Sequence, residues 1–115
     1  MNEVDRTLIV AKLVPGSENQ IAQIFSESDA GELPRQMDVQ ERSLYVLRDL
    51  YVHIIDFESE AEQRIKSGQD SAGFRDISER LSRHVRPYDP ETWRSPADAM
   101  ARRFYHWKAD EVFDA

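Results

Sequence analysis

The apolar residues of this chain change spacing several times, which divides the sequence into short alternating strands and helices. Residues 7–14, with the sequence TLIVAKLV, are rich in β-branched side chains and apolar on both faces, as is typical of a central strand. A turn follows, and Ser17 is predicted to cap a helix that ends near Gly31. The apolar stripe of this helix has the spacing i, i+3, i+4, i+7 and consists of Ile21, Ile24, Phe25 and Ser28.

Residues 39–57 predict a β-hairpin. Two alternating segments, VQERSLYVL and LYVHIIDF, are joined by the dipeptide Arg48-Asp49. After the hairpin, helical spacing covers about residues 59–85, with a break predicted near residues 67–71. The second half of this zone carries an apolar helical stripe of Phe74, Ile77, Leu81 and Val85.

The C-terminal part of the chain is predicted to return to a strand. Pro87 and Pro90 are expected to end the preceding helix. The sequence Ser95-Pro96-Ala97-Asp98 has the form of a capping box with proline at the first helical position, so a short helix is expected there. The segment ARRFYHW, residues 101–107, has strand character. The predicted order of elements is therefore β-α-β-β-α-β.

This order predicts an α+β fold of the ferredoxin-like, split βαβ type with a four-stranded antiparallel sheet. Both helices would cover one face of the sheet, and an open apolar face of that size usually marks an interaction surface. We therefore expect a homodimer, in the form of a dimeric α+β barrel. With 115 residues, the chain is expected to be a single domain, residues 1–115, with its core at about residues 6–107.

Composition narrows the classes of function. The sequence has no cysteine, which excludes disulfides, thiolate metal sites and cysteine nucleophiles. Its net charge of -7 argues against a nucleic-acid partner. The apolar run from Leu8 to Val14 is broken by Lys12, which fits neither a signal peptide nor a membrane span. The three histidines lack metal-ligand spacing, so we expect no metal site. The absence of cysteine suits a reducing compartment, and we expect a cytoplasmic protein.

A histidine interrupts the apolar row of the second hairpin strand. His53 shares a face with Tyr51, Ile55 and Phe57, and an unpaired buried polar group costs about 1–3 kcal/mol. A symmetric turn at Arg48-Asp49 places Leu44 opposite His53. Arg42 then lies diagonally from His53 on the same face, within reach of a long side chain. The hairpin therefore predicts an arginine and a histidine side by side on an otherwise apolar face.

The end of the first helix supplies two more polar candidates. Ser28 completes the apolar stripe and Asp29 follows it directly. An aspartate at a helix C-terminus opposes the macrodipole, and a carboxylate with a raised pKa would suit a general base. A helix end beside a sheet can enclose a pocket, in which Ser28, Asp29, Arg42 and His53 would be the polar groups.

Structural explanations compete with these functional ones. A histidine in a strand is more often a satisfied structural residue, Arg42 could belong to a structural ion pair, and Asp29 could be a turn former before Gly31. Three further arginines near the end of the second helical zone, Arg80, Arg83 and Arg86, are interpreted as a solvated helix end.

Four segments of the sequence resemble the small aromatic polyketide cyclases of the tetracenomycin type. They are SDAGELP, ERSLYVLRDLYVHIIDF, FRDISERL and YDPETWRSPADAMARRFYHW. The resemblance runs from about Arg6 to Trp107, and its most specific segments are ELP, DLYVH and TWRSPADAMARRFY. The last of these is nearer to cyclases from angucycline and spore-pigment clusters than to the tetracenomycin one.

The resemblance implies a dimeric ferredoxin-like fold that works without a cofactor and has a pocket between sheet and helices. It also implies an activity, intramolecular aldol condensation and dehydration that close rings on an aromatic polyketide intermediate of a type II synthase. The acyl carrier protein and other synthase subunits are then further candidate partners. An acidic carrier protein could dock at Arg80, Arg83 and Arg86, although a solvated helix end stays the favoured interpretation of this cluster. Two alternatives remain open, a cofactor-free monooxygenase on the same fold and a non-catalytic module that binds and steers the polyketide.

The family's site residues correspond to positions already singled out. Its site arginine corresponds to Arg42, which would bind a ketone or enolate oxygen, and its strand histidine corresponds to His53, which would shuttle protons if its pKa stays near neutral. The family's helix-end pair His-Asp corresponds to Ser28-Asp29. Asp29 would therefore take a proton or orient the group that does, whereas Ser28 could only donate a hydrogen bond.

Aromatic side chains would complete such a site. Tyr51, Phe57 and Phe25 are expected to stack on flat, partly cyclised intermediates and so to act as substrate-binding residues.

Overall fold

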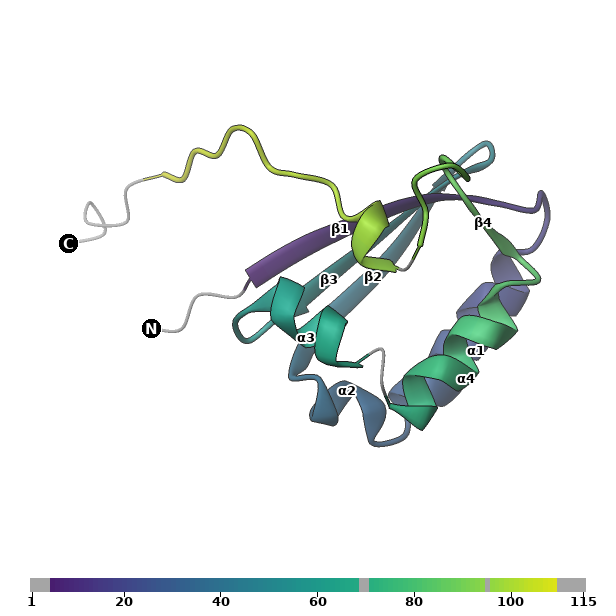
Figure 1. The fold of residues 1–115 in the computed structure, drawn as a ribbon, viewed down its shortest axis with the longest axis horizontal. Coiled ribbons are helices and arrows are strands. Elements are labelled where there is room, and N and C mark those ends of the chain that lie inside the picture. Colours follow the sequence, from purple (N-terminus) through teal and green to yellow (C-terminus); the bar gives the residue numbers. More distant parts are fainter. Residues whose placement is uncertain (1–4, 69–70, 95, 110–115) are drawn as a thin grey trace.

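The computed structural model of the chain describes residues 5–68, 71–94 and 96–109. It has the expected α+β class and four-stranded antiparallel sheet (Figure 1). The strands are β1 (Asp5–Leu13), β2 (Val39–Leu47), β3 (Leu50–Phe57) and β4 (Val85–Pro87). The helices are α1 (Glu18–Asp29), α2 (Leu33–Gln36), α3 (Ala61–Gly68), α4 (Ala72–Leu81) and the 3₁₀-helix η1 (Pro96–Ala99).

The hairpin has the register that its sequence predicted. The strand order is β2-β3-β1-β4, so β1 is central, and β2 and β3 meet at the two-residue turn Arg48-Asp49. Leu44 pairs with His53, and Arg42 pairs with Ile55. Arg48 has a φ of 57°, the left-handed conformation that primed hairpin turns need. This register fixes which side chains of β2 and β3 share the inner face of the sheet.

The helices cover one face of the sheet and leave the other open (Figure 1). The inner face carries buried residues of β1 and β3, including Ile9, Ala11, Ile55 and Phe57. On the outer face Leu8, Val10, Val52 and Ile54 are half-buried, and Tyr45 and Leu47 are 59% and 69% exposed. None of the described helices is long and apolar enough to cross a membrane.

The first helix has the predicted span but not the predicted cap. Ser17 occupies the N-cap position, yet its hydroxyl donates to the carbonyl of Val14 at 2.6 Å instead of accepting from the first turn. The helix ends at Asp29 with Ala30 as its C-cap, and the backbone N–H of Gly31 bonds back to the carbonyl of Ser28. Through its hydrogen bond to Val14, Ser17 closes the turn before the helix and does not cap the helix.

The second helical zone breaks as predicted but ends early. The side chain of Ser71 caps α4 by accepting a hydrogen bond from the N–H of Phe74 at 3.0 Å. The helix ends at Leu81, so the prediction that helical structure continues to Val85 is wrong. Val85 instead begins the edge strand β4, which pairs with β1. Pro87 lies within this strand, at its last position, where a missing backbone N–H is tolerated at a sheet edge.

The prediction that residues 101–107 form the fourth strand is also wrong. The fourth strand is β4. After η1, Met100 bridges Ile9 and the N–H of Ala101 donates to the carbonyl of Leu8. Residues 102–109 then run away from the domain (Figure 1). The short helix before them is present as η1, whereas Ser95 of the expected capping box lies outside the described residues.

Candidate functional site

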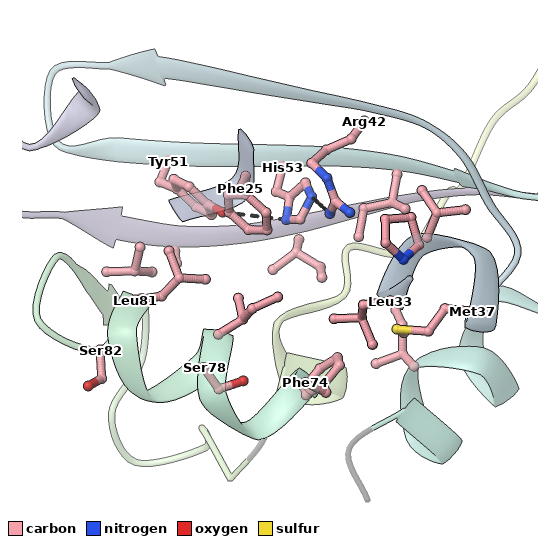
Figure 2. A pocket seen from close by; sticks show the side chains of 18 of the residues that line it. Phe25, Leu33, Met37, Arg42, Tyr51, His53, Phe74, Ser78, Leu81 and Ser82 are labelled. Atoms are coloured by element: carbon pink, nitrogen blue, oxygen red, sulfur yellow. Dashed lines mark hydrogen bonds between the residues drawn. The ribbon is translucent and has the colours of Figure 1, made fainter. Parts of the chain in front are cut away.

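A cavity of about 540 Å³ lies between the inner face of the sheet and the helices α2 and α4. This volume falls within the roughly 300–1,000 Å³ of small-molecule sites. The apolar stripe of α4 faces the cavity, and for that reason Phe74, Ile77 and Leu81 are only half-buried although the helix is amphipathic. Figure 2 shows Phe74 and Leu81 on α4 across the cavity from the strand residues Arg42 and His53.

Arg42 joins the helix end to the sheet at the cavity wall. Its Nε donates to Oδ2 of Asp29 at 3.0 Å and its Nη2 donates to Oδ1 at 2.8 Å, which makes a two-pronged ion pair. Its Nη1 lies 3.0 Å from Nε2 of His53. The Arg42 side chain is 15% exposed, and its guanidinium carbon lies 4.7 Å from the centre of the Phe25 ring. Contacts on several sides therefore fix the direction of the guanidinium.

The guanidinium keeps hydrogen-bonding capacity for a ligand. Nη1 and Nη2 each carry a second hydrogen. Among the described residues, these two hydrogens have no hydrogen-bond partner. Arg42 lines the cavity, so it can present a fixed positive charge and two N–H groups to an oxygen atom there.

His53 lies between Arg42 and Tyr51. It is 5% exposed, and its ring packs edge-on against Phe25 with centroids 5.0 Å apart. Burial, and after it the charge of Arg42, lower the pKa of His53 from 6.5 to about 3. The imidazole is therefore neutral at physiological pH, and the condition attached to its expected role as a proton shuttle, a pKa near neutral, is not met.

Five of the six other residues singled out in the sequence take part in this arrangement. Arg42 and Asp29 form the ion pair, and Phe25, Tyr51 and Phe57 line the cavity. Phe57 is fully buried and belongs to the inner-face core. Ser28 is half-buried, does not line the cavity, and its hydroxyl has no hydrogen bond to the described residues.

Sequence reasoning missed the opposite wall of the cavity. The helix α2 was not predicted. Its Leu33 and Pro34, and Trp93 and Arg94 after β4, belong to the segments ELP and TWRSPADAMARRFY but were not named as site residues. The α4 stripe was found, but its spacing indicated only which face is apolar and not whether that face meets the sheet or a cavity. The arginine cluster is partly structural, because Nη2 of Arg80 donates to Glu27 of α1 at 2.8 Å.

Comparison with known proteins gives a consistent result. The family model described as polyketide synthesis cyclase matches residues 5–108. The chain is 47% identical over 103 residues to an uncharacterized protein of Streptomyces coelicolor, covering 89% of this chain and 93% of that one. It is 45% identical over 103 residues to the polyketide synthase CurG of Streptomyces cyaneus, covering 90% and 96%.

One relative also has a solved structure. Tetracenomycin F2 cyclase of Streptomyces glaucescens is 30% identical over 106 residues, covering 92% of this chain and 96% of the relative. Its structure, described as a type II polyketide cyclase, superposes with a TM-score of 0.84 at 30% identity, covering 92% of this chain and 99% of the other. The match over nearly the whole chain shows that this protein belongs to the polyketide synthesis cyclase family.

Proposed function

We propose that this protein closes a ring on an aromatic polyketide by intramolecular aldol condensation and dehydration, with side chains of the cavity and no cofactor. One observation carries the proposal. Arg42, held by Asp29 and His53, presents a positive charge at the wall of a mostly apolar cavity, with two N–H groups that have no partner among the described residues. Membership of the cyclase family supports the same reaction class.

The chemistry assigns a different task to each group. The carbon between two carbonyl groups of a polyketide loses a proton to water and attacks a second ketone in the same chain, which forms a carbon–carbon bond and an alkoxide. Protonation of the alkoxide and loss of water complete the ring. Arg42 would stabilise the enolate or alkoxide oxygen as its charge develops. Asp29 and His53 would act as positioning residues for Arg42.

The apolar walls would bring the reacting carbons together. The cavity is enclosed on two sides. Phe25 of α1 and Tyr51 of β3 form part of one wall, and Phe74 and Ile77 of α4 form part of the other. Holding two reacting groups in the right geometry can supply an effective molarity of about 10⁵ M or more. A folded polyketide in this cavity would gain most of its acceleration from that confinement and from Arg42.

A second candidate function has its own support. His53 is neutral, and both carboxylate oxygens of Asp29 accept hydrogen bonds from Arg42. This arrangement also suits a module that binds the polyketide and steers its folding while closure proceeds spontaneously. The acyl carrier protein and other synthase subunits are proposed partners in either case.

The experiment that tests the cyclase proposal is a product profile. The synthase and its early-acting partners are reconstituted with and without this protein, with and without oxygen. A cyclase is expected to shift shunt products to a further-cyclised aromatic compound to the same extent under anaerobic conditions. A shift that requires oxygen would indicate the monooxygenase alternative, and no shift would contradict a role in ring closure.

We also propose that two copies of this chain associate through the outer face of the sheet and the C-terminal segment. The outer face carries half-buried apolar residues that no described element of the chain covers, namely Leu8, Val10, Val52 and Ile54. Phe104, Tyr105 and Trp107 are 88%, 76% and 70% exposed. Apolar surface of this extent on one chain favours association, and a second copy offers the same two surfaces in return.

The dimer proposal predicts the effect of two variants. Val52→Glu places a charge at the centre of the outer face, and Phe104→Ser/Trp107→Ser removes aromatic surface from the C-terminal segment. We expect the wild type to sediment as a dimer and both variants as monomers at the same concentration. Ala22→Glu, an equal charge on the exposed side of α1, should remain dimeric. A monomeric wild type, or dimeric variants, would contradict the proposal.

A further inference from the structure

The hydroxyl group of Tyr51 has no role in the chemistry assigned above. Tyr51 is 4% exposed, lies on β3 two residues before His53, and lines the cavity. Its Oη is 3.4 Å from Nδ1 of His53, and among the described residues it has no other hydrogen-bond partner. Figure 2 shows the row formed by Tyr51, His53 and Arg42 along the sheet side of the cavity.

The hydrogen-bond network fixes where the imidazole proton lies. A guanidinium can only donate, so Nε2 of His53 must accept the hydrogen bond from Nη1 of Arg42. A neutral imidazole has a single N–H, which must then be on Nδ1. The other tautomer would point two N–H groups at each other across 3.0 Å. A second proton on the ring would add a charge beside Arg42 in a buried site.

This tautomer leaves the hydroxyl hydrogen of Tyr51 unused. Nδ1–H of His53 donates to Oη of Tyr51, so the Tyr51 O–H bond is free to point elsewhere. Burial raises the pKa of the Tyr51 phenol well above its ordinary value, and the nearby Arg42 lowers it by less. The hydroxyl therefore stays protonated and acts as a donor. The part of the cavity around it is formed mainly by apolar residues, Ala11, Phe25, Ile77 and Leu81 among them.

Once a ligand has displaced water from the cavity, a buried donor in an apolar wall needs an acceptor on that ligand. We propose that Tyr51 donates its hydroxyl hydrogen to a second carbonyl or enol oxygen of the polyketide and thereby selects which carbonyl lies at Arg42. This inference rests on the proposed function. A polyketide carries oxygen on alternate carbons, so two donors at a fixed separation along one wall set the register of the chain. Tyr51 is then a specificity-determining residue, and His53 positions both donors.

The first test concerns His53 and needs no substrate. In protein labelled with ¹⁵N-histidine, long-range ¹H–¹⁵N spectra are recorded from pH 5 to pH 8, and His53→Gln identifies the His53 signals. We expect hydrogen on Nδ1, none on Nε2, and no titration over this range, because the ring is buried and Arg42, itself paired with Asp29, is the charged group next to it. A hydrogen on Nε2, or titration near neutral pH, would overturn the proposal.

The second test compares Tyr51→Phe with a matched control, Tyr45→Phe on the outer face of the sheet. The probe is 1,8-dihydroxyanthraquinone, a flat aromatic ketone, titrated by fluorescence. We expect Tyr51→Phe to bind it about three- to tenfold more weakly than the wild type, as the loss of one hydrogen bond predicts, and Tyr45→Phe to bind it equally. Equal affinities for the wild type and Tyr51→Phe, or no saturable binding by the wild type, would overturn the proposal.

The third test concerns register. In the reconstituted synthase, Tyr51→Phe should change the proportions of ring-closed products more than their total amount, whereas a merely structural tyrosine would lower all products together. The results separate this inference from the proposed function. A wild type that closes rings while Tyr51→Phe gives the same product proportions would overturn the role of Tyr51 alone. A wild type that binds the probe through Tyr51 but closes no ring would overturn the cyclase proposal alone.

Discussion

Replacing Arg42 with glutamine is expected to lower the rate of ring closure by about 10²–10³-fold, the effect of removing one preorganised donor from a developing oxyanion. Glutamine keeps a hydrogen-bond donor but removes the charge and the fork that holds Asp29. The rate is measured as the single-turnover formation of cyclised product in the reconstituted synthase. Affinity for a flat aromatic ketone should fall much less, because the ketone of the ground state carries little negative charge.

Two further variants separate charge from geometry at this position. Arg42→Lys keeps the charge but cannot contact Asp29, His53 and a ligand together, so we expect it to recover only part of the rate. Arg35→Gln removes an arginine whose side chain is 83% exposed on α2, and it should leave the rate unchanged. Unaltered product formation by Arg42→Gln would favour the steering module, in which confinement by the cavity walls is sufficient.

The polar part of the site could be predicted because it depends on strand geometry. Side chains alternate along a strand, and a two-residue turn fixes the pairing, so the contact between Arg42 and His53 follows from counting residues back from Arg48-Asp49. The contact with Asp29 required a further step. The sequence indicates that Asp29 lies at the end of α1, but only the packed structure shows that this helix end lies next to Arg42.

The cavity could not be predicted, because periodicity reports the direction of a side chain and not the distance to its neighbour. Phe74, Ile77 and Leu81 have the spacing of core residues and would read the same whether α4 contacted the sheet or stood away from it. Ser28 shows the opposite case, a residue on a helical stripe that does not line the cavity. It falls on the apolar stripe of α1, but helical spacing does not say how far along the helix the cavity extends.

The error at the C-terminus has a related cause. The aromatic residues of ARRFYHW favour a strand, but their presence carries no information about which strand or which chain they pair with. The edge of β1 near Ala11 is occupied by β4, and the C-terminal segment leaves β1 after Ala101. Its exposed aromatic residues are explained if their partner is a second copy.

His53 couples the stability of the protein to the same network that orients Arg42. Because its pKa is lowered to about 3 in the folded chain, the folded state takes up no proton here as the pH falls below 6.5, the ordinary value, whereas the unfolded chain does. The free energy of unfolding therefore decreases between pH 6.5 and about pH 3, by up to about 1.4 kcal/mol per pH unit. We expect about 2 kcal/mol to be lost between pH 7 and pH 5.

Urea unfolding at pH 7 and pH 5, at one protein concentration, measures this loss. His53→Gln keeps an acceptor for Arg42 and cannot titrate, so the variant should lose about 2 kcal/mol less than the wild type over the same interval. Asp56, whose pKa is lowered chiefly by its hydrogen bond to Arg6, also destabilises the fold in acid, but only as the pH falls below about 3.8. Equal losses in the two proteins would mean that His53 takes up a proton in the folded state. Nε2 would then no longer be an acceptor, and the hydrogen bonds that orient Arg42 and Tyr51 would have to be different.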